Sequence, residues 1–218
     1  IVRSARVSYD ADWRAGDDKG SDKRLIKYLM KNGHNTPFES VVVTIDVKAP
    51  IFVFRQWHRH RTQSYNELSA RYRPLPNEWY IPDPWVIGTQ SKDNKQMRDI
   101  MSQEDWVRSE DWDIKDHNLD SVEMIDRANR ESFDVYTELL ERGVPREIAR
   151  SVLPVGMFSH MFATANLNNW YRFLQERLHE HAQHEIRVYA VEILKILEIV
   201  APVATNAFKV KIGYTHDT

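Results

Sequence analysis

The residues most capable of chemistry lie in one short segment, 55–73, which reads RQWHRHRTQSYNELSARYR. It holds five arginines and two histidines, Glu67 is its only acid, and it contains no lysine. Arginine without lysine is typical of sites for flat oxyanions, because a guanidinium forms two parallel hydrogen bonds with phosphate. Ser64, Asn66 and Ser69 add donors and acceptors that suit a polar ring. The segment therefore predicts a site for phosphate beside a polar heterocycle.

A solvated patch of surface salt bridges explains the same composition about equally well. The periodicity of residues 61–78 matches neither a helix nor a strand, so we expect a loop there. Because loops carry binding sites more often than regular elements do, this favours the functional interpretation.

Composition excludes several kinds of site. The chain has 218 residues, a formal net charge of −2 and no cysteine. This charge argues against a nucleic-acid or membrane partner, and the missing cysteine excludes disulfides, thiolate metal sites and a cysteine nucleophile. The absence of cysteine also suits a reducing cytoplasm.

None of the seven glycines forms a Rossmann or P-loop motif. No apolar run is long enough to span a bilayer and no signal peptide is visible, although the chain opens with Ile1, so we expect residues to be missing before it.

The elements expected to position this segment are mixed. Apolar spacing and glycine or proline stops predict helices over 21–33, 50–57, 119–142 and 167–200, the last with a break near 179–184. Thr36 is expected to cap a further helix with Pro37 at its first position. Alternating β-branched residues predict strands over 41–47 and 157–165. Residues 84–118 are mostly polar and read as a surface insertion. The expected fold is a single α+β domain, a sheet flanked by helices.

The motif of segment 55–73 resembles the signature of the flavin-dependent thymidylate synthases, the ThyX family. The matching positions are Arg59-His60-Arg61, Ser64, Asn66-Glu67, Ser69 and Arg71-Tyr72. Four other stretches are similar to segments of the same family: Arg6-Val7-Ser8, residues 33–39, residues 144–154, and residues 166–186. The resemblance covers most of residues 1–218 and implies one ThyX-like domain, with 84–118 as the part that matches nothing.

This resemblance implies a reaction. The family converts dUMP to dTMP, takes the one-carbon unit from methylenetetrahydrofolate and the reducing equivalents from NADPH through FAD, and uses no cysteine nucleophile. It also implies a cytoplasmic homotetramer whose active sites are shared between subunits, with dUMP, folate and NADPH as partners and neither nucleic acid nor membrane.

The resemblance also assigns residues to ligands. Arg71 and Arg150 are implied to hold the dUMP phosphate, and Arg177 to promote ionisation of uracil N3 as the catalytic residue. The residues assigned to dUMP are Gln56, Arg59, Glu67, Leu68, Ser69, Ala70, Arg71, Arg150 and Arg177. Those assigned to FAD are Ser8, His34, Thr36, Arg59, His60, Arg61, Glu67, Asn166, Asn168 and Arg172. Two positions depart from the family pattern, since members often carry Arg at position 168 and Asn or His at position 172.

Other interpretations remain open for some of these residues. Without the family, Arg177 beside an apolar helix stripe is more often an interface residue than a catalytic one. His179, His181 and His184 narrowly miss the H-E-x-x-H zinc motif, and we expect no metal. A nucleic-acid module that stacks bases on aromatic residues, and an oligomeric scaffold without activity, are the two alternatives from other classes.

Overall fold

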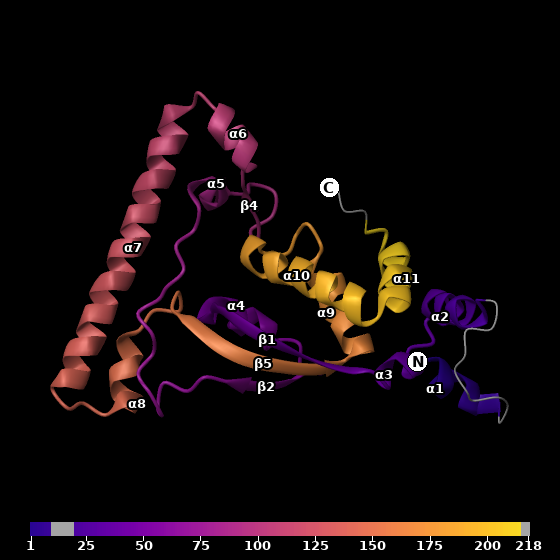
Figure 1. The fold of residues 1–218 in the computed structure, drawn as a ribbon. Helices are drawn as coiled ribbons and strands as arrows, with labels where there is room; N and C mark the ends of the chain where they lie inside the picture. Colours follow the sequence, from indigo (N-terminus) through magenta and orange to yellow (C-terminus); the bar gives the residue numbers. More distant parts are fainter. Residues whose placement is uncertain (10–19, 215–218) are drawn as a thin grey trace. The chain divides into compact units, whose positions relative to one another are not determined.

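The computed structural model describes residues 1–9 and 20–214, which form two compact units (Figure 1). The first comprises Ile1–Ile45, His60–Tyr65 and Phe162–Thr218, and the second comprises Asp46–Arg59 and Asn66–Met161. Three of the four points at which the chain passes from one unit to the other fall within strands, namely β1 (Val42–Pro50), β2 (Ser64–Glu67) and β5 (Phe158–Asn166). The mixture of helices with this small sheet confirms the predicted α+β class.

The three-stranded sheet has the order β1-β5-β2. Strands β1 and β5 are antiparallel. In the first unit the hydroxyls of Thr44 and Thr164 lie 2.9 Å apart. In the second unit Asp46 pairs with His160. Residue numbers thus rise along β1 while those of their partners on β5 fall, which is the mark of antiparallel strands. Buried and exposed residues alternate along β5, as the sequence pattern predicts for a strand with two different faces.

The first unit is mainly helical. Its helices are α1 (Val2–Arg6), the 3-10 turn η1 (Val7–Tyr9), α2 (Ser21–Lys31), α3 (Thr36–Glu39), α9 (Leu167–Arg177), α10 (His184–Val200) and α11 (Pro202–Ile212). Helix α9 buries Trp170, Tyr171 and Phe173 on one broad face. The Trp170 indole donates to the Val43 carbonyl of β1 at 3.0 Å, and the Tyr171 ring stacks on Phe208 of α11. These contacts fix α9 relative to the sheet within this unit.

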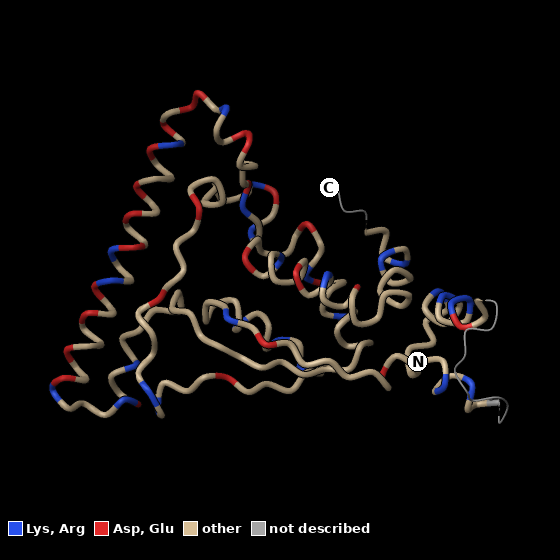
Figure 2. The backbone as a smooth tube through the Cα atoms, viewed as in Figure 1, with Lys and Arg blue, Asp and Glu red and all other residues tan. Residues whose placement is uncertain are grey.

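The second unit contains the remaining helices and a hairpin. They are α4 (Ile51–Trp57), α5 (Pro84–Ile87), the hairpin β3 (Thr89–Gln90) and β4 (Arg98–Asp99), α6 (Gln103–Arg108), α7 (Trp112–Glu141), α8 (Arg146–Ala149) and the 3-10 turn η2 (Arg150–Val152). Acidic residues outnumber basic ones along α7 (Figure 2), and the pairs Asp126–Arg130 and Glu138–Arg142 are spaced i,i+4. Its buried Tyr136 accepts a hydrogen bond from the Leu75 amide at 3.3 Å. None of the helices among residues 1–9 and 20–214 is both long and apolar enough to cross a membrane.

Three expectations were wrong. Thr36 is not the cap of α3, because Asn35 already has a helical backbone and occupies the cap position without a side-chain hydrogen bond. The expected loop 61–78 contains β2, whose formation depends on pairing with β5 and is therefore invisible to local periodicity.

The third correction concerns the start of the helix predicted over 119–142, because residues 84–118 contain α5, β3, β4, α6 and the first part of α7. Ser102 and Asp111 accept hydrogen bonds from Asp105 N and Ile114 N, so they cap α6 and α7 and start α7 seven residues before the predicted position 119. Gly88 has a φ of 62°, and a Cβ there would clash with the Asp99 carbonyl, so the hairpin requires glycine.

Candidate functional site

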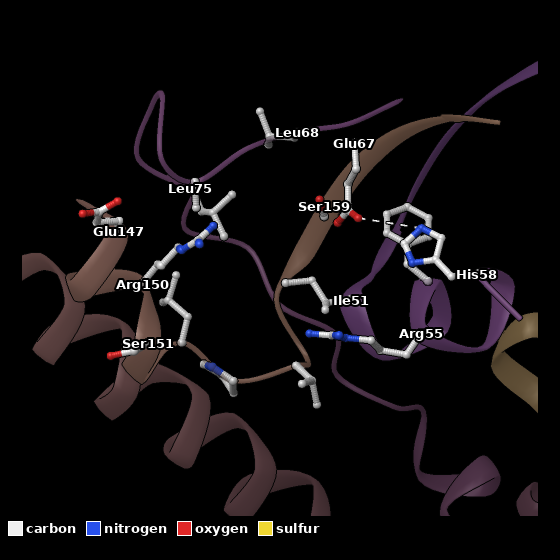
Figure 3. A pocket seen from close by; sticks show the side chains of 15 residues that line it. Ile51, Arg55, His58, Glu67, Leu68, Leu75, Glu147, Arg150, Ser151 and Ser159 are labelled. Carbon is white, nitrogen blue, oxygen red and sulfur yellow. Dashed lines mark ion pairs between the residues drawn. The ribbon is translucent and has the colours of Figure 1, made fainter. Parts of the chain in front are cut away.

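The second unit contains a cavity of about 540 Å³ (Figure 3). Its walls come from α4, the chain after β2, the α8–η2 segment and the start of β5. Four of the residues assigned to dUMP line it: Glu67, Leu68, Ala70 and Arg150. Segments that are separated by about 80 positions in the sequence therefore meet at this cavity, and the nucleotide role of these residues stays a prediction.

Positive charge enters this cavity from two sides. Arg55 on α4 and Arg150 on η2 both line the cavity and direct their guanidinium groups toward it (Figure 3). Glu147 and Glu67 are its two acids. A concave site with two guanidiniums at its walls suits a phosphorylated ligand, because each can form charge-assisted, bidentate hydrogen bonds.

His58 lies in the cavity wall and was not among the predicted site residues. Its Nε2 lies 3.9 Å from a Glu67 carboxylate oxygen and 3.3 Å from the Met161 sulfur, and its ring stacks on Phe54. Ile51, Phe54, Arg55 and His58 follow the i, i+3, i+4, i+7 spacing of one helix face. That spacing is the signal in the sequence that would have found Arg55 and His58.

Other predicted dUMP residues lie outside this cavity. Arg71 lines a hollow of about 240 Å³ beside Tyr72 and Glu147, and its guanidinium is 3.4 Å from the Glu147 carboxylate. Because more than half of each side chain is exposed, this ion pair contributes little to stability. Ser69 accepts from the Arg71 amide at 3.3 Å. Gln56 and Arg59 are not among the residues that line the larger cavity.

In the first unit, Arg177 at the end of α9 donates from Nε to His60 Nε2 at 2.9 Å. Burial, and secondarily the charge of Arg177, lowers the pKa of His60 to about 4, so the imidazole is neutral at neutral pH and can accept this bond. Burial also lowers the pKa of Arg177, while Glu176 raises it, and an arginine remains charged in proteins. The catalytic residue implied by the resemblance is thus a half-buried cation held by a neutral acceptor.

The residues assigned to FAD lie in the first unit apart from Arg59 and Glu67. Asn166 caps α9 by accepting from Asn169 N at 2.9 Å, and Asn168 donates to Glu39 of α3 at 3.3 Å. The others have exposed or half-buried side chains: Ser8, His34, Thr36, His60, Arg61 and Arg172. Two of these residues depart from the family pattern. Asn168 links α9 to Glu39 of α3, and Arg172 is an exposed cation on α9.

No group of three metal-ligating side chains gathers anywhere in the parts of the chain that the structure describes. His179 and His181 contact each other edge to face at 4.7 Å, and His181 lies 3.5 Å from Glu180.

The two arginines of the cavity suit an anionic ligand, and comparisons with known proteins identify the family. The family model of the thymidylate synthase complementing protein (Thy1) matches residues 1–203. The flavin-dependent thymidylate synthase of Thermotoga neapolitana is 42% identical over 216 residues, 99% of this chain and 87% of that protein. The enzyme of the same name from Thermosipho africanus is 40% identical over 218 residues, again 99% and 87%.

Among solved structures, the UMP/dUMP methylase PolB from Streptomyces cacaoi, bound with 5-Br dUMP, is similar with a TM-score of 0.82 and 34% identity. The similarity covers 96% of this chain and 88% of that one. The chain belongs to the thymidylate synthase complementing protein family.

Proposed function

We propose that this protein is a flavin-dependent thymidylate synthase that methylates dUMP to dTMP, with methylenetetrahydrofolate as one-carbon donor and NADPH as reductant through FAD. The observation that carries the proposal is the cavity in which Glu67, Leu68, Ala70 and Arg150 come together. The relatives support it, since two are named flavin-dependent thymidylate synthases and PolB is a UMP/dUMP methylase. The proposal takes residues 1–218 as one catalytic domain and places the enzyme in the cytoplasm.

The direct test is product formation. The protein is incubated with dUMP, methylenetetrahydrofolate, NADPH and FAD, and nucleotides are separated by chromatography. We expect dTMP, and we expect none when FAD is omitted from flavin-free protein. Because one relative is named for UMP as well as dUMP, UMP serves as the second substrate. Absence of dTMP from a folded, flavin-loaded protein would overturn the proposal.

The residues of this chain act by binding and electrostatics. FAD, when bound, supplies the redox chemistry. Arg150 in the cavity and Arg71 in the neighbouring hollow that shares Glu147 would bind the phosphate and orient the nucleotide. Arg177 stabilises negative charge on the uracil ring, which makes C5 electron-rich enough to take the methylene group. Its Nε–H donates to His60, so its two terminal amino groups would be the donors available to N3 and a carbonyl oxygen of the uracil. No cysteine is available as a nucleophile.

The donor set in the first unit fits a flavin dinucleotide. Arg61 and Arg172 are exposed cations, Asn166 caps α9, and Asn168 lies in the first turn of that helix. Exposed guanidiniums suit a diphosphate, and amides suit the hydrogen-bonding edge of a flavin ring. These residues, with His34, Thr36 and Ser8, would hold FAD.

We expect the protein to bind FAD without a covalent bond. Arg61→Ala should weaken binding about 10- to 100-fold, because a charged hydrogen bond to the diphosphate is lost. The measurement is quenching of FAD fluorescence on titration, with flavin absorbance after desalting. Arg127→Ala, which removes an exposed arginine of α7, is the matched control. Neither absorbance nor quenching with excess FAD would contradict the expectation.

The enzyme is further proposed to be a homotetramer with shared sites. Helices α10 and α11 present exposed apolar side chains, namely Val188, Ile196, Ile199, Val200 and Val210. Ile199 is 83% exposed, and such a face is typical of a surface that packs against another subunit.

A mixture of inactive variants tests the sharing. Arg71→Ala and Arg177→Ala should each be inactive, and activity should partly return when their subunits are exchanged, because some sites then carry neither lesion. Exchange is confirmed by mass spectrometry. Activity that stays at the sum of the two parents after exchange, or a fully active monomer by light scattering, would show that each site is built within one subunit.

A further inference from the structure

We propose that His60 is a positioning residue that fixes the guanidinium plane of Arg177 for the reaction, a role that rests on the proposed function. The contact is a hydrogen bond from Arg177 Nε to His60 Nε2 of 2.9 Å. A bond at Nε restrains rotation of the planar guanidinium, so the two terminal amino groups keep one direction. Positioning of this kind matters because a misplacement of about 1 Å can cost ~100-fold in rate.

The imidazole is itself held by its neighbours. Phe173 of α9 contacts the ring edge to face, with centroids 4.7 Å apart. The His60 carbonyl accepts from the Tyr65 hydroxyl at 2.7 Å and from the Gln63 amide at 3.3 Å. Ring and backbone are thus both fixed, and the acceptor atom has a defined place before any ligand binds.

The chemical identity of the acceptor has a consequence for the charge of Arg177. A carboxylate at this place would neutralise the cation, whereas a neutral imidazole orients it and leaves its charge available to an anionic uracil. Desolvation and Arg177 itself lower the pKa of His60 to about 4, so the neutral form dominates near neutral pH. Because Nε2 accepts the hydrogen bond from Arg177, the imidazole proton lies on Nδ1. The described residues give Arg177 no carboxylate within ion-pair distance.

Two substitutions of His60 separate the effect of its hydrogen-bond acceptor from the effect of its volume. Gln places an amide oxygen near the position of Nε2 and keeps an acceptor, whereas Leu fills the space without one. In single turnovers of FAD-loaded enzyme, His60→Leu should slow dTMP formation about 10- to 100-fold, and His60→Gln should stay within about 5-fold of the unaltered protein. His117→Gln, at an exposed histidine of α7, is the control. Equal losses in the Leu and Gln variants, or a loss confined to FAD affinity, would overturn the positioning role.

A second measurement does not depend on activity. Melting temperatures are compared for His60→Leu, Arg177→Leu and the double variant, all with FAD present. If the hydrogen bond couples the two side chains, the double variant should lose less than the sum of the single losses. Additive losses would overturn the proposal. A different result is possible: the stability losses of the two variants are coupled, but the protein forms no dTMP. That result would support the hydrogen bond between His60 and Arg177 and would overturn both the proposed function and the positioning role.

Discussion

Arg177→Lys should lower the single-turnover rate of dTMP formation by about 100- to 1,000-fold, while FAD binding stays close to that of the unaltered protein. Lysine keeps the charge but loses the planar fork, so it cannot give two parallel hydrogen bonds to the uracil and a third to His60 at once. The measurement starts from reduced enzyme, mixes it with dUMP and methylenetetrahydrofolate, and follows flavin oxidation and dTMP.

The control for this substitution is Arg127→Lys on α7, which should leave the rate unchanged because the side chain is exposed. Near-normal dTMP formation by Arg177→Lys would remove this residue from catalysis. If the melting temperature of Arg177→Lys falls together with its rate, Arg177 has a structural role. Its Nε would then serve mainly as the hydrogen-bond donor to the buried His60 ring.

Arg150→Ala should weaken dUMP binding by about 30- to 5,000-fold, or ~2–5 kcal/mol, because a charged partner of the phosphate is lost. The fold should be little affected. The Arg150 side chain is exposed at the cavity wall, and truncating such a residue changes stability by less than about 0.5 kcal/mol. Calorimetric titration with dUMP and a melting curve of the same preparation measure the two effects separately.

Arg142→Ala is the matched control for Arg150→Ala, because it removes an exposed arginine that pairs along α7 with Glu138. It should leave dUMP affinity unchanged. An Arg150→Ala variant with normal affinity would show that another group, for which Arg55 on the facing wall is the next candidate, holds the phosphate.

Local sequence signals determined most of the elements. The break between α9 and α10 falls at 178–183, close to the predicted 179–184, and Gly33 and Gly143 stop helices with φ values of 69° and 79°. These features depend on apolar spacing and glycine conformation, which are properties of neighbouring residues. The motif of segment 55–73 could likewise be found from the sequence alone, because its five arginines and lack of lysine are features of composition.

Features that depend on distant partners were missed. Strand β2 exists because it pairs with β5, nearly a hundred positions away, and its own residues alternate too weakly to reveal it. The cap predicted at Thr36 failed because the chain before it already turns as helix at Asn35. Helix α11 went unpredicted, although its Phe208 packs on Tyr171 of α9.

By itself, the sequence determined the kinds of residue available for chemistry: arginines, one motif glutamate and no cysteine. Only the tertiary structure decided which of them meet. It brought Arg55 of α4 and His58, which caps that helix, to the same cavity as Arg150, and it set His60 against Arg177 across more than a hundred positions. The physical reason is that burial and a hydrogen-bond partner, which together make His60 a neutral acceptor, are supplied by the packing of α9 and not by the neighbours of His60 in the chain.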